Sequence, residues 1–321
     1  MDPENTIVTI FGGSGFIGRH LVRALAKRGY RLCVAVRRPD LAGYLQPLGR
    51  VGQIYPVQAN VRYPDSVEAA VREASIVVNL VGVLYQRGKQ RFEALQAEAP
   101  GTIARAAARV GARMIHVSAI GADLESPSLY AQTKARGEEA VLAATRWATI
   151  FRPSIVFGPE DDFFNRFAAM ARLSPILPLI GGGRTLFQPV FVGDVARAIA
   201  KAVEGETRPT TIYELGGPEI KTFKELLQFV LATTGRRRWL VPLPFAVAQF
   251  QAQFLALLPK PPLTPDQVRL LRFDNVVSTA AIHEGRTLQG LGIEPSTMEA
   301  IVPSYLWRFR KTGQFRNNPA L

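Results

Sequence analysis

The chain has 321 residues, of which 47% are hydrophobic, and it carries a formal net charge of +13 at pH 7. This length allows one large domain or two smaller ones, and the charge favours an acidic partner: a nucleotide, an anionic membrane or an acidic protein surface. The arginines are dispersed without an aromatic-interleaved basic block, which argues against nucleic acid. A single cysteine, Cys33, excludes a disulfide framework and indicates a reducing compartment, and three widely separated histidines do not suggest a metal site.

The first predicted elements are a strand, a glycine-rich turn and a helix. Residues 7–11 are β-branched or aromatic, and the turn that follows places glycine at three-residue intervals before an amphipathic pattern. Glycines let backbone approach a pyrophosphate closely, and a helix N-terminus offers free N–H groups and partial positive charge. The order of parts therefore predicts a dinucleotide site. The residues expected to contact the cofactor are Gly12, Ser14, Gly15, Phe16, Ile17, Gly18 and Arg19. The alternative is a glycine-rich turn that binds nothing.

The second predicted strand, residues 31–36, ends in Arg37 and Arg38. A site for NAD usually has Asp or Glu at this point, because a carboxylate accepts hydrogen bonds from the ribose hydroxyls. Guanidinium groups cannot accept, but they bind a 2′-phosphate through charge-assisted bonds, and Arg19 would add a third contact. The sequence thus favours NADP(H) over NAD(H), unless the two arginines form only a solvated strand end.

Strands and helices alternate through the rest of the first half. Helices are expected at residues 67–73, 102–110 and 131–144, and strands at residues 75–82, 114–118 and 148–153. Repeated units of this length predict an α/β fold with a doubly wound parallel sheet, with ligand at the carboxyl ends of the strands.

The alternation becomes weaker after Gly158. We expect helices at residues 163–173 and 195–203, a loop at 175–183 and a last strand at 211–215. The domain prediction is a dinucleotide-binding domain over residues 1–217, with a cap insertion near 159–186, and a C-terminal cap or interaction region over 218–321. The polar N-terminus leads directly into a strand, which predicts no signal peptide.

Residues 236–258 combine three arginines, Trp239 and an apolar stretch interrupted by prolines and glutamines. These interruptions argue against a membrane span. The pattern predicts either an element that lies on an anionic membrane or a partner, or a cap helix over a substrate pocket. After this segment, Thr264 and Pro265 are typical of an N-capped helix start.

Two motifs, the Tyr-Ala-Gln-Thr-Lys segment 130–134 and the Arg-Pro-Ser-Ile-Val-Phe-Gly-Pro segment 152–159, resemble those of extended, atypical short-chain dehydrogenases/reductases. The segments 115–118, 158–165 and 188–195 are more specifically similar to the NADPH-binding accessory subunit of respiratory complex I (the 39-kDa subunit family) and its bacterial relatives. This resemblance covers nearly the whole chain. It implies bound NADPH, a position on the cytoplasmic or matrix side of a membrane complex, and a structural role.

In the wider family the tyrosine of this motif is the general acid/base, and the lysine one helical turn later lowers the pKa of its phenol. The resemblance assigns these roles to Tyr130 and Lys134. The third family residue is a Ser or Thr that contacts the substrate carbonyl, and Ile120 stands at its position here. Ser118 is the remaining candidate for that role, and also for cofactor contact. The alternative is that Tyr130 only packs and Lys134 only holds the ribose of a permanent cofactor.

The resemblance also implies further cofactor contacts. Asn60 and Val61 would meet the adenine, residues 80–82 (Leu80, Val81, Gly82) the adenosine and its ribose, and residues 153–155 (Pro153, Ser154, Ile155) the nicotinamide. Core packing is the alternative role for each.

Together these features predict a non-catalytic, NADP(H)-binding accessory subunit of NADH:quinone oxidoreductase or of a quinone-metabolism assembly. The expected location is cytoplasmic, or peripheral on the inner face of the membrane or on the matrix side. The alternatives are an NADPH-dependent oxidoreductase that uses Tyr130 and Lys134, and an NAD-dependent epimerase or dehydratase.

Overall fold

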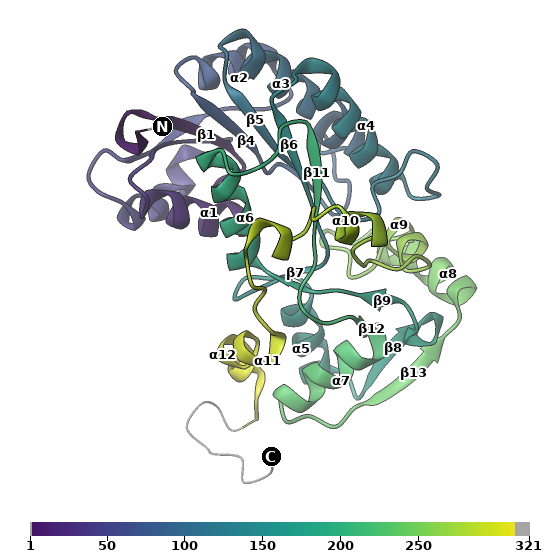
Figure 1. Cartoon of the computed structure of the whole chain (residues 1–321). Coiled ribbons are helices and arrows are strands. Elements are labelled where there is room, and N and C mark those ends of the chain that lie inside the picture. Colours follow the sequence, from purple (N-terminus) through teal and green to yellow (C-terminus); the bar gives the residue numbers. More distant parts are fainter. Residues whose placement is uncertain (1, 312–321) are drawn as a thin grey trace. The chain divides into compact units, whose positions relative to one another are not determined.

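A computed structural model describes residues 2–311, and their contacts divide the chain into two units (Figure 1). Unit 1 comprises the residues up to Pro153 together with Val192–Leu215 and Val277–Glu294. Unit 2 comprises Ser154–Phe191, Gly216–Val276 and the described residues from Pro295 to 311. This division differs from the one expected at residue 217, because Val277–Glu294 packs with unit 1.

The centre of unit 1 is a seven-stranded sheet in which every neighbouring pair is parallel. Its strands are β1 (Ile7–Phe11), β2 (Arg31–Val36), β3 (Ile54–Gln58), β4 (Ile76–Asn79), β5 (Arg113–Val117), β6 (Ala148–Pro153) and β11 (Thr211–Leu215). They lie in the order β11-β6-β5-β4-β1-β2-β3, so the direction of winding reverses between β1 and β4. The predicted doubly wound parallel sheet is confirmed, and this reversal is where such folds bind ligands.

Helices cover both faces of this sheet (Figure 1). On one face lie α2 (Pro64–Val71), α3 (Ala99–Arg109) and α4 (Leu129–Ala144), and on the other lie α1 (Phe16–Ala26) and α6 (Val192–Glu204). Val67, Ile103 and Val141, one from each of α2, α3 and α4, are fully buried in one cluster with Val77 and Met114 of the sheet. Strands buried on both faces become nearly continuous apolar runs, as β1, β2 and β4 are. The short helix α10 (Thr279–His283) completes unit 1.

Unit 2 has shorter elements around an aromatic core. Its helices are α5 (Phe164–Leu173), α7 (Phe223–Thr233), α8 (Phe245–Leu255), α9 (Pro265–Leu270), α11 (Met298–Ile301) and α12 (Pro303–Leu306). Its strands are β7 (Val156–Phe157), β8 (Ile176–Ile180), β9 (Leu186–Phe187), β10 (Val190–Phe191), β12 (Lys221–Thr222) and β13 (Trp239–Leu243). The strands form three two-stranded sheets, β7 with β10, β8 with β13 and β9 with β12. Phe157, Phe164, Phe187 and Phe223 are buried in the core that these elements share.

The prediction of a loop at residues 175–183 is wrong for the first half of this range. Ile176–Ile180 forms strand β8, which pairs in parallel with β13, and Leu177 and Leu179 are buried. Each strand of a two-stranded sheet has one unpaired edge, so Pro178 removes no ladder hydrogen bond that the sheet requires. The expected helix start at Thr264 is confirmed: its hydroxyl accepts from Gln267 N–H at 3.3 Å, and its own N–H donates to the Gln267 side chain at 3.1 Å.

Candidate dinucleotide site

Two close contacts between backbone atoms shape the glycine turn after β1. Gly12 has φ +79°, and its carbonyl accepts a hydrogen bond from Gly15 N–H at 3.0 Å. A Cβ added to Gly18 would lie 2.5 Å from the carbonyl oxygens of both Gly12 and Gly13. Only glycine at position 18 therefore lets α1 begin directly on the turn.

The first turn of α1 carries no side-chain cap, because its N-cap residue is Gly15. Its leading N–H groups are therefore left for a ligand, at the positive end of the helix. Ser14 lies in the same turn, and its carbonyl accepts a hydrogen bond from the Tyr44 hydroxyl at 2.6 Å. Phe16 and Ile17 supply the first N–H groups of the helix. This is a cradle that fits an anionic pyrophosphate.

The three arginines near this turn differ in their surroundings. The Arg38 guanidinium donates to both carboxylate oxygens of Asp40, at 2.9 and 2.7 Å. The Arg19 guanidinium lies 5.4 Å from the centre of the Tyr44 ring. Arg37 is exposed and makes no hydrogen bond or ion pair with another residue of the 2–311 range. Among the arginines at the end of β2, Arg37 is thus the one that a phosphate could engage without first breaking an ion pair.

The loops after β3 and β4 are held by local bonds. Asn60 Oδ1 accepts from both the N–H and the Nε of Arg62 at 3.3 Å. Asn79 Oδ1 accepts from Val81 N–H at 3.0 Å, and Leu80 N–H donates to the Phe11 carbonyl at 2.9 Å. Like Val61, Val81 packs partly buried against the core on the α2–α4 side of the sheet. Packing in the core therefore explains the partial burial of Val61 and Val81. Their contacts with the cofactor remain predictions.

Lys134 is buried in α4, and its Nζ donates to the Val117 carbonyl at 3.3 Å. The same nitrogen lies 6.0 Å from the centre of the Tyr130 ring, and 3.3 Å from where a Cβ on Gly82 would be. Burial lowers the pKa of Lys134 to about 8, against the opposing effect of the nearby Glu138 carboxylate. The structure therefore brings the predicted pair together with the loop after β4, as one helical turn of spacing requires.

Tyr130 lies in the first turn of α4, whose start is fixed by Ser128. The Ser128 hydroxyl accepts from Ala131 N–H at 3.3 Å. The Tyr130 ring is half-buried and meets the Phe92 ring edge to face, with 5.7 Å between the ring centres. This contact holds the ring, so both a catalytic and a purely structural role are compatible with its position.

The two positions after β5 differ in chemistry. The Ser118 hydroxyl is buried, and no residue of the described chain hydrogen-bonds to it. Ile120 N–H donates to the Pro153 carbonyl at 3.0 Å, while its side chain is buried with Val277 and Ala281. The position that would offer a hydroxyl to a substrate carbonyl is thus part of an apolar cluster. A buried hydroxyl without a protein partner needs a bonding partner of another kind, which a cofactor would supply.

Asn79 and His116 were not predicted as site residues, yet they form a buried polar pair at the same ends of the strands. Asn79 Nδ2 lies 3.2 Å from His116 Nδ1, and since an amide nitrogen only donates, Nδ1 accepts. Burial, aided by the positive charge of Lys134, lowers the pKa of His116 to about 3. The imidazole is therefore neutral with its proton on Nε2, which no described residue accepts. The signal in the sequence was a polar side chain at the end of each of two apolar strands.

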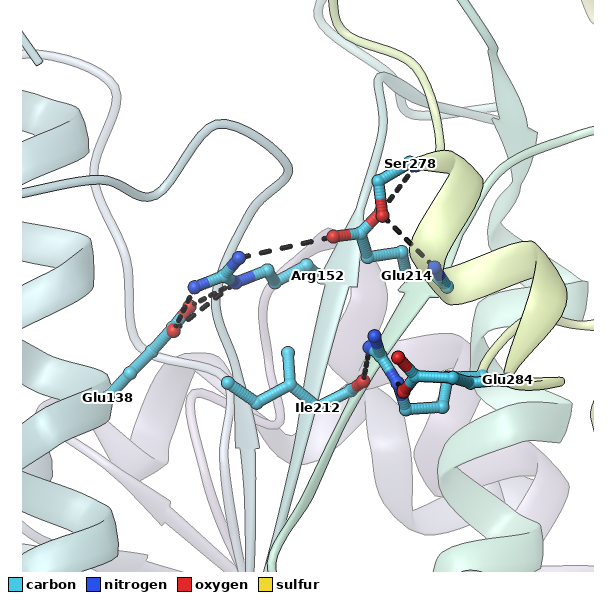
Figure 2. Close-up of polar contacts among 8 residues, drawn as sticks. Glu138, Arg152, Ile212, Glu214, Ser278 and Glu284 are labelled. Atoms are coloured by element: carbon cyan, nitrogen blue, oxygen red, sulfur yellow. Dashed lines mark hydrogen bonds and ion pairs between the residues drawn. The ribbon is translucent and has the colours of Figure 1, made fainter.

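A second polar group is centred on Arg152 (Figure 2), and its member Glu138 lies one helical turn after Lys134. The Arg152 guanidinium donates to the Glu138 carboxylate at 2.9 and 2.6 Å, and its other end nitrogen lies 4.0 Å from Glu214. Glu214 accepts in turn from Ser278 N–H at 2.7 Å. These contacts join α4, β6, β11 and the start of α10.

Ser154 and Ile155 belong to unit 2, whereas Pro153 ends β6 in unit 1. The Ser154 hydroxyl lies 2.7 Å from Oδ1 of Asn275 and 2.9 Å from its carbonyl oxygen. Ile155 N–H donates to the same Oδ1 at 3.2 Å, and its side chain packs against the aromatic core. Asn275 thus fixes the backbone just beyond β6, and the predicted contacts of these three residues with nicotinamide remain predictions.

Comparison with known proteins defines the class of protein to which this chain belongs. Residues 8–216 match the model of the NAD dependent epimerase/dehydratase family, so the chain belongs to that family, whose cofactor class is a nicotinamide dinucleotide. Within it, the chain is similar to the mitochondrial NADH dehydrogenase (ubiquinone) 1 alpha subcomplex subunit 9 of Arabidopsis thaliana. The two are 36% identical over 323 residues, which cover 96% of this chain and 79% of the relative. The resemblance to the complex I subunit family is thereby confirmed.

Two other similarities concern enzymes. A ceramide reductase of Caulobacter vibrioides is 35% identical over 174 residues, which cover 54% of each chain. The structure of a dTDP-glucose 4,6-dehydratase from Bacillus anthracis, in complex with NAD, matches with a TM-score of 0.70 over 95% of this chain and 96% of the other. At 16% identity that match shows a common fold alone.

Proposed function

We propose that this protein holds NADP(H) in unit 1 and acts as an accessory, non-catalytic subunit of NADH:quinone oxidoreductase (complex I), or of a related quinone-metabolism assembly. The observation that carries this proposal is the similarity to the alpha subcomplex subunit 9 proteins over nearly the whole chain. The buried Ile120 supports the absence of turnover, because it leaves an apolar side chain where the resemblance calls for a substrate-binding hydroxyl.

In this proposal Gly12, Gly15 and Gly18 let the backbone hold the pyrophosphate, and Arg37 pairs with the 2′-phosphate. A guanidinium binds a phosphate bidentately and cannot accept hydrogen bonds from ribose hydroxyls, which is why NADP(H) is preferred over NAD(H). Lys134 holds the nicotinamide ribose, and the Ser118 hydroxyl gains a partner at the edge of the same site. Bound NADP(H) supplies hydride chemistry; in the accessory role the residues only bind it.

The location follows from the proposed partner. A protein attached to complex I lies at the surface of the membrane that carries the complex. We propose the inner face of a cytoplasmic membrane, or the matrix side of a mitochondrial one.

An NADPH-dependent oxidoreductase is the second candidate, and the position of Lys134 favours it. The ammonium group lies beside the Tyr130 ring, and its positive charge would favour the phenolate form of the tyrosine. Tyr130 would then donate its proton to a substrate carbonyl during reduction. Similarity to a ceramide reductase over half the chain supports this candidate. An epimerase or dehydratase would use the same pair.

One experiment separates these functions. The tagged protein is purified gently from its native host, its bound nucleotide and co-purifying proteins are identified by mass spectrometry, and nicotinamide absorbance is followed with a short-chain quinone and with ketone and aldehyde substrates. Retained NADPH that is not oxidised, together with complex I subunits, supports the accessory function. Steady oxidation that is lost in Tyr130→Phe but kept in the control Tyr63→Phe, a tyrosine just before α2, overturns it in favour of the enzyme.

A further inference from the structure

In helix α8 of unit 2, two alanines face inward and two phenylalanines face outward. Ala248 and Ala252 are fully buried, against Ile180 and Val268. Phe250 and Phe254, by contrast, are 62% and 60% exposed. A helix that packs only on its own domain in water normally has the opposite arrangement.

Large apolar side chains dominate the outward side of α8. At 100° per residue, Val247, Phe250 and Phe254 lie opposite the buried alanines, and the rings of Phe250 and Phe254 meet edge to face with 5.1 Å between their centres. Leu257 and Leu258 continue this side in the turn after the helix, and both are exposed. Gln249 is partly buried, whereas Gln251 and Gln253 are exposed and border this apolar side.

The charged side chains of the segment that contains this helix are all basic. Residues 239–258 contain no charged side chain, and no Asp or Glu occurs between Glu225 and Asp266. The same interval has four basic residues, Arg236, Arg237, Arg238 and Lys260. The Arg238 guanidinium donates to the Ala171 carbonyl at 2.7 Å, which places it next to Arg172 at the end of α5.

Strand β13 leads from these arginines to α8 (Figure 1). It begins with Trp239, which is 79% exposed and pairs in register with the exposed Ile176 of β8. Tryptophan beside basic residues is typical of the boundary between lipid headgroups and acyl chains. The basic residues, the tryptophan and the apolar side of α8 therefore follow one another along a single segment.

We propose that the segment 236–260 is a docking surface for an anionic phospholipid bilayer. The outward side of α8 enters the headgroup–acyl boundary, and Arg237 and Lys260 face the lipid phosphates. The charge favours lipid, because a bilayer with anionic lipids is negative over its whole surface and so matches a segment whose charged residues are all basic. No helix within residues 2–311 is long and apolar enough to cross a bilayer, so contact is at the surface. This inference rests on the membrane location in the proposed function and adds its lipid chemistry.

The test is flotation of the purified full-length protein with vesicles of phosphatidylcholine, either alone or mixed with phosphatidylglycerol. We expect binding to the mixed vesicles, weakened by salt. Phe250→Ser with Phe254→Ser should reduce that binding about tenfold or more. Arg237→Gln with Lys260→Gln should reduce it about fivefold per charge removed. Trp239→Ser should weaken binding, whereas Trp147→Ser, at a tryptophan that is also exposed but lies in unit 1, should not.

Two results would overturn the inference: no binding of the wild type to anionic vesicles, or binding that neither double variant weakens. If the wild type self-associates through α8 and does not bind vesicles, the partner of this surface is a second copy of the chain and not lipid. The charge variants alter only exposed side chains, so they remain informative if the phenylalanine variants do not fold. The vesicle assay does not contain complex I, so it tests the lipid surface separately from the proposed function. If the protein co-purifies with complex I but does not bind vesicles, the proposed function is supported and only the lipid surface is contradicted.

Discussion

Glu138 and Arg152 form a two-point ion pair inside unit 1, with hydrogen bonds of 2.9 and 2.6 Å (Figure 2). Glu138 lies one helical turn after Lys134 and is almost fully buried. Its negative charge raises the pKa of Lys134, while burial lowers it more strongly. Lys134, Glu138, Arg152 and Glu214 thus make a row of alternating charges. The Glu138 carboxylate thus favours the protonated form of the lysine against the effect of burial.

Glu138→Gln should lower the free energy of unfolding by about 2 to 3 kcal/mol, because it leaves the Arg152 charge without its carboxylate. The loss is smaller than for a fully buried pair, since 22% of the Arg152 side chain remains exposed. Urea unfolding would measure it. The matched control is Glu93→Gln: Glu93 pairs with Arg136, also on α4, at 2.9 Å, but both side chains are well exposed. Its effect should be within about 0.5 kcal/mol of zero. Equal effects of the two variants would contradict this account.

His116 should make the protein sensitive to acid. Its pKa is about 3 in the folded chain and 6.5 ordinarily, so between these values the unfolded chain binds more protons than the folded one. Folding stability therefore rises with pH across this window and is lost as pH falls from 6.5 towards 3. In the wild type this loss in the free energy of unfolding should be about 1.4 kcal/mol for each pH unit. His116→Asn has no imidazole to protonate, so its free energy of unfolding should not show this loss. Urea unfolding at a series of pH values tests this, and parallel curves for wild type and variant would refute it.

Gly18→Ala should weaken dinucleotide binding strongly. The added methyl group would overlap the carbonyl oxygens of Gly12 and Gly13, so α1 must move away from the turn. We expect an affinity loss of more than about tenfold in NADPH titrations followed by fluorescence. Gly43→Ala is the control, because its nearest neighbour would be a flexible side-chain oxygen at 3.9 Å. Unchanged affinity in Gly18→Ala would show that the turn is not the pyrophosphate site.

Arg37 and Arg38 should contribute differently to cofactor choice. Arg37→Ser should weaken NADPH binding by about ten- to a hundredfold, the range for one hydrogen bond between charged groups, and leave NADH binding nearly unchanged. Arg38→Ser should have a smaller effect, because Asp40 already occupies the Arg38 guanidinium. Titration of both variants with both cofactors would measure this. A larger effect from Arg38 would mean that the Asp40 pair opens when the cofactor binds.

The parts of the fold that depend on local patterns could be predicted from the sequence. The glycine turn, the strand–helix alternation and the spacing of Tyr130 and Lys134 each need only a few neighbouring residues. Strand β8 could not be predicted, because its partner β13 lies some sixty residues further along the chain and Pro178 hides the strand pattern. The bond between Glu214 and Ser278 likewise joins residues 64 apart.

The Arg38 ion pair is a different case, since its partner Asp40 is only two residues away. Both residues are visible in the sequence, but the prediction assigned the arginines to a phosphate and included no ion pair with Asp40. Asn79 and His116 were also visible as polar residues at the ends of apolar strands. Their pairing needed the register of β4 with β5, in which the two residues are direct neighbours.

The placement of Val277–Glu294 in unit 1 has a consequence for how the protein folds as it is made. Strand β11 is an edge of the main sheet, and this late segment covers it: Arg286 donates to the Ile212 carbonyl at 2.6 Å and accepts from Glu214 N–H at 2.9 Å. Domains usually fold in order as they leave the ribosome. Here unit 1 keeps an open strand edge until residues 277–294 have been synthesised. A nascent or truncated chain that lacks this segment should therefore need a chaperone, or it will pair that edge with another chain.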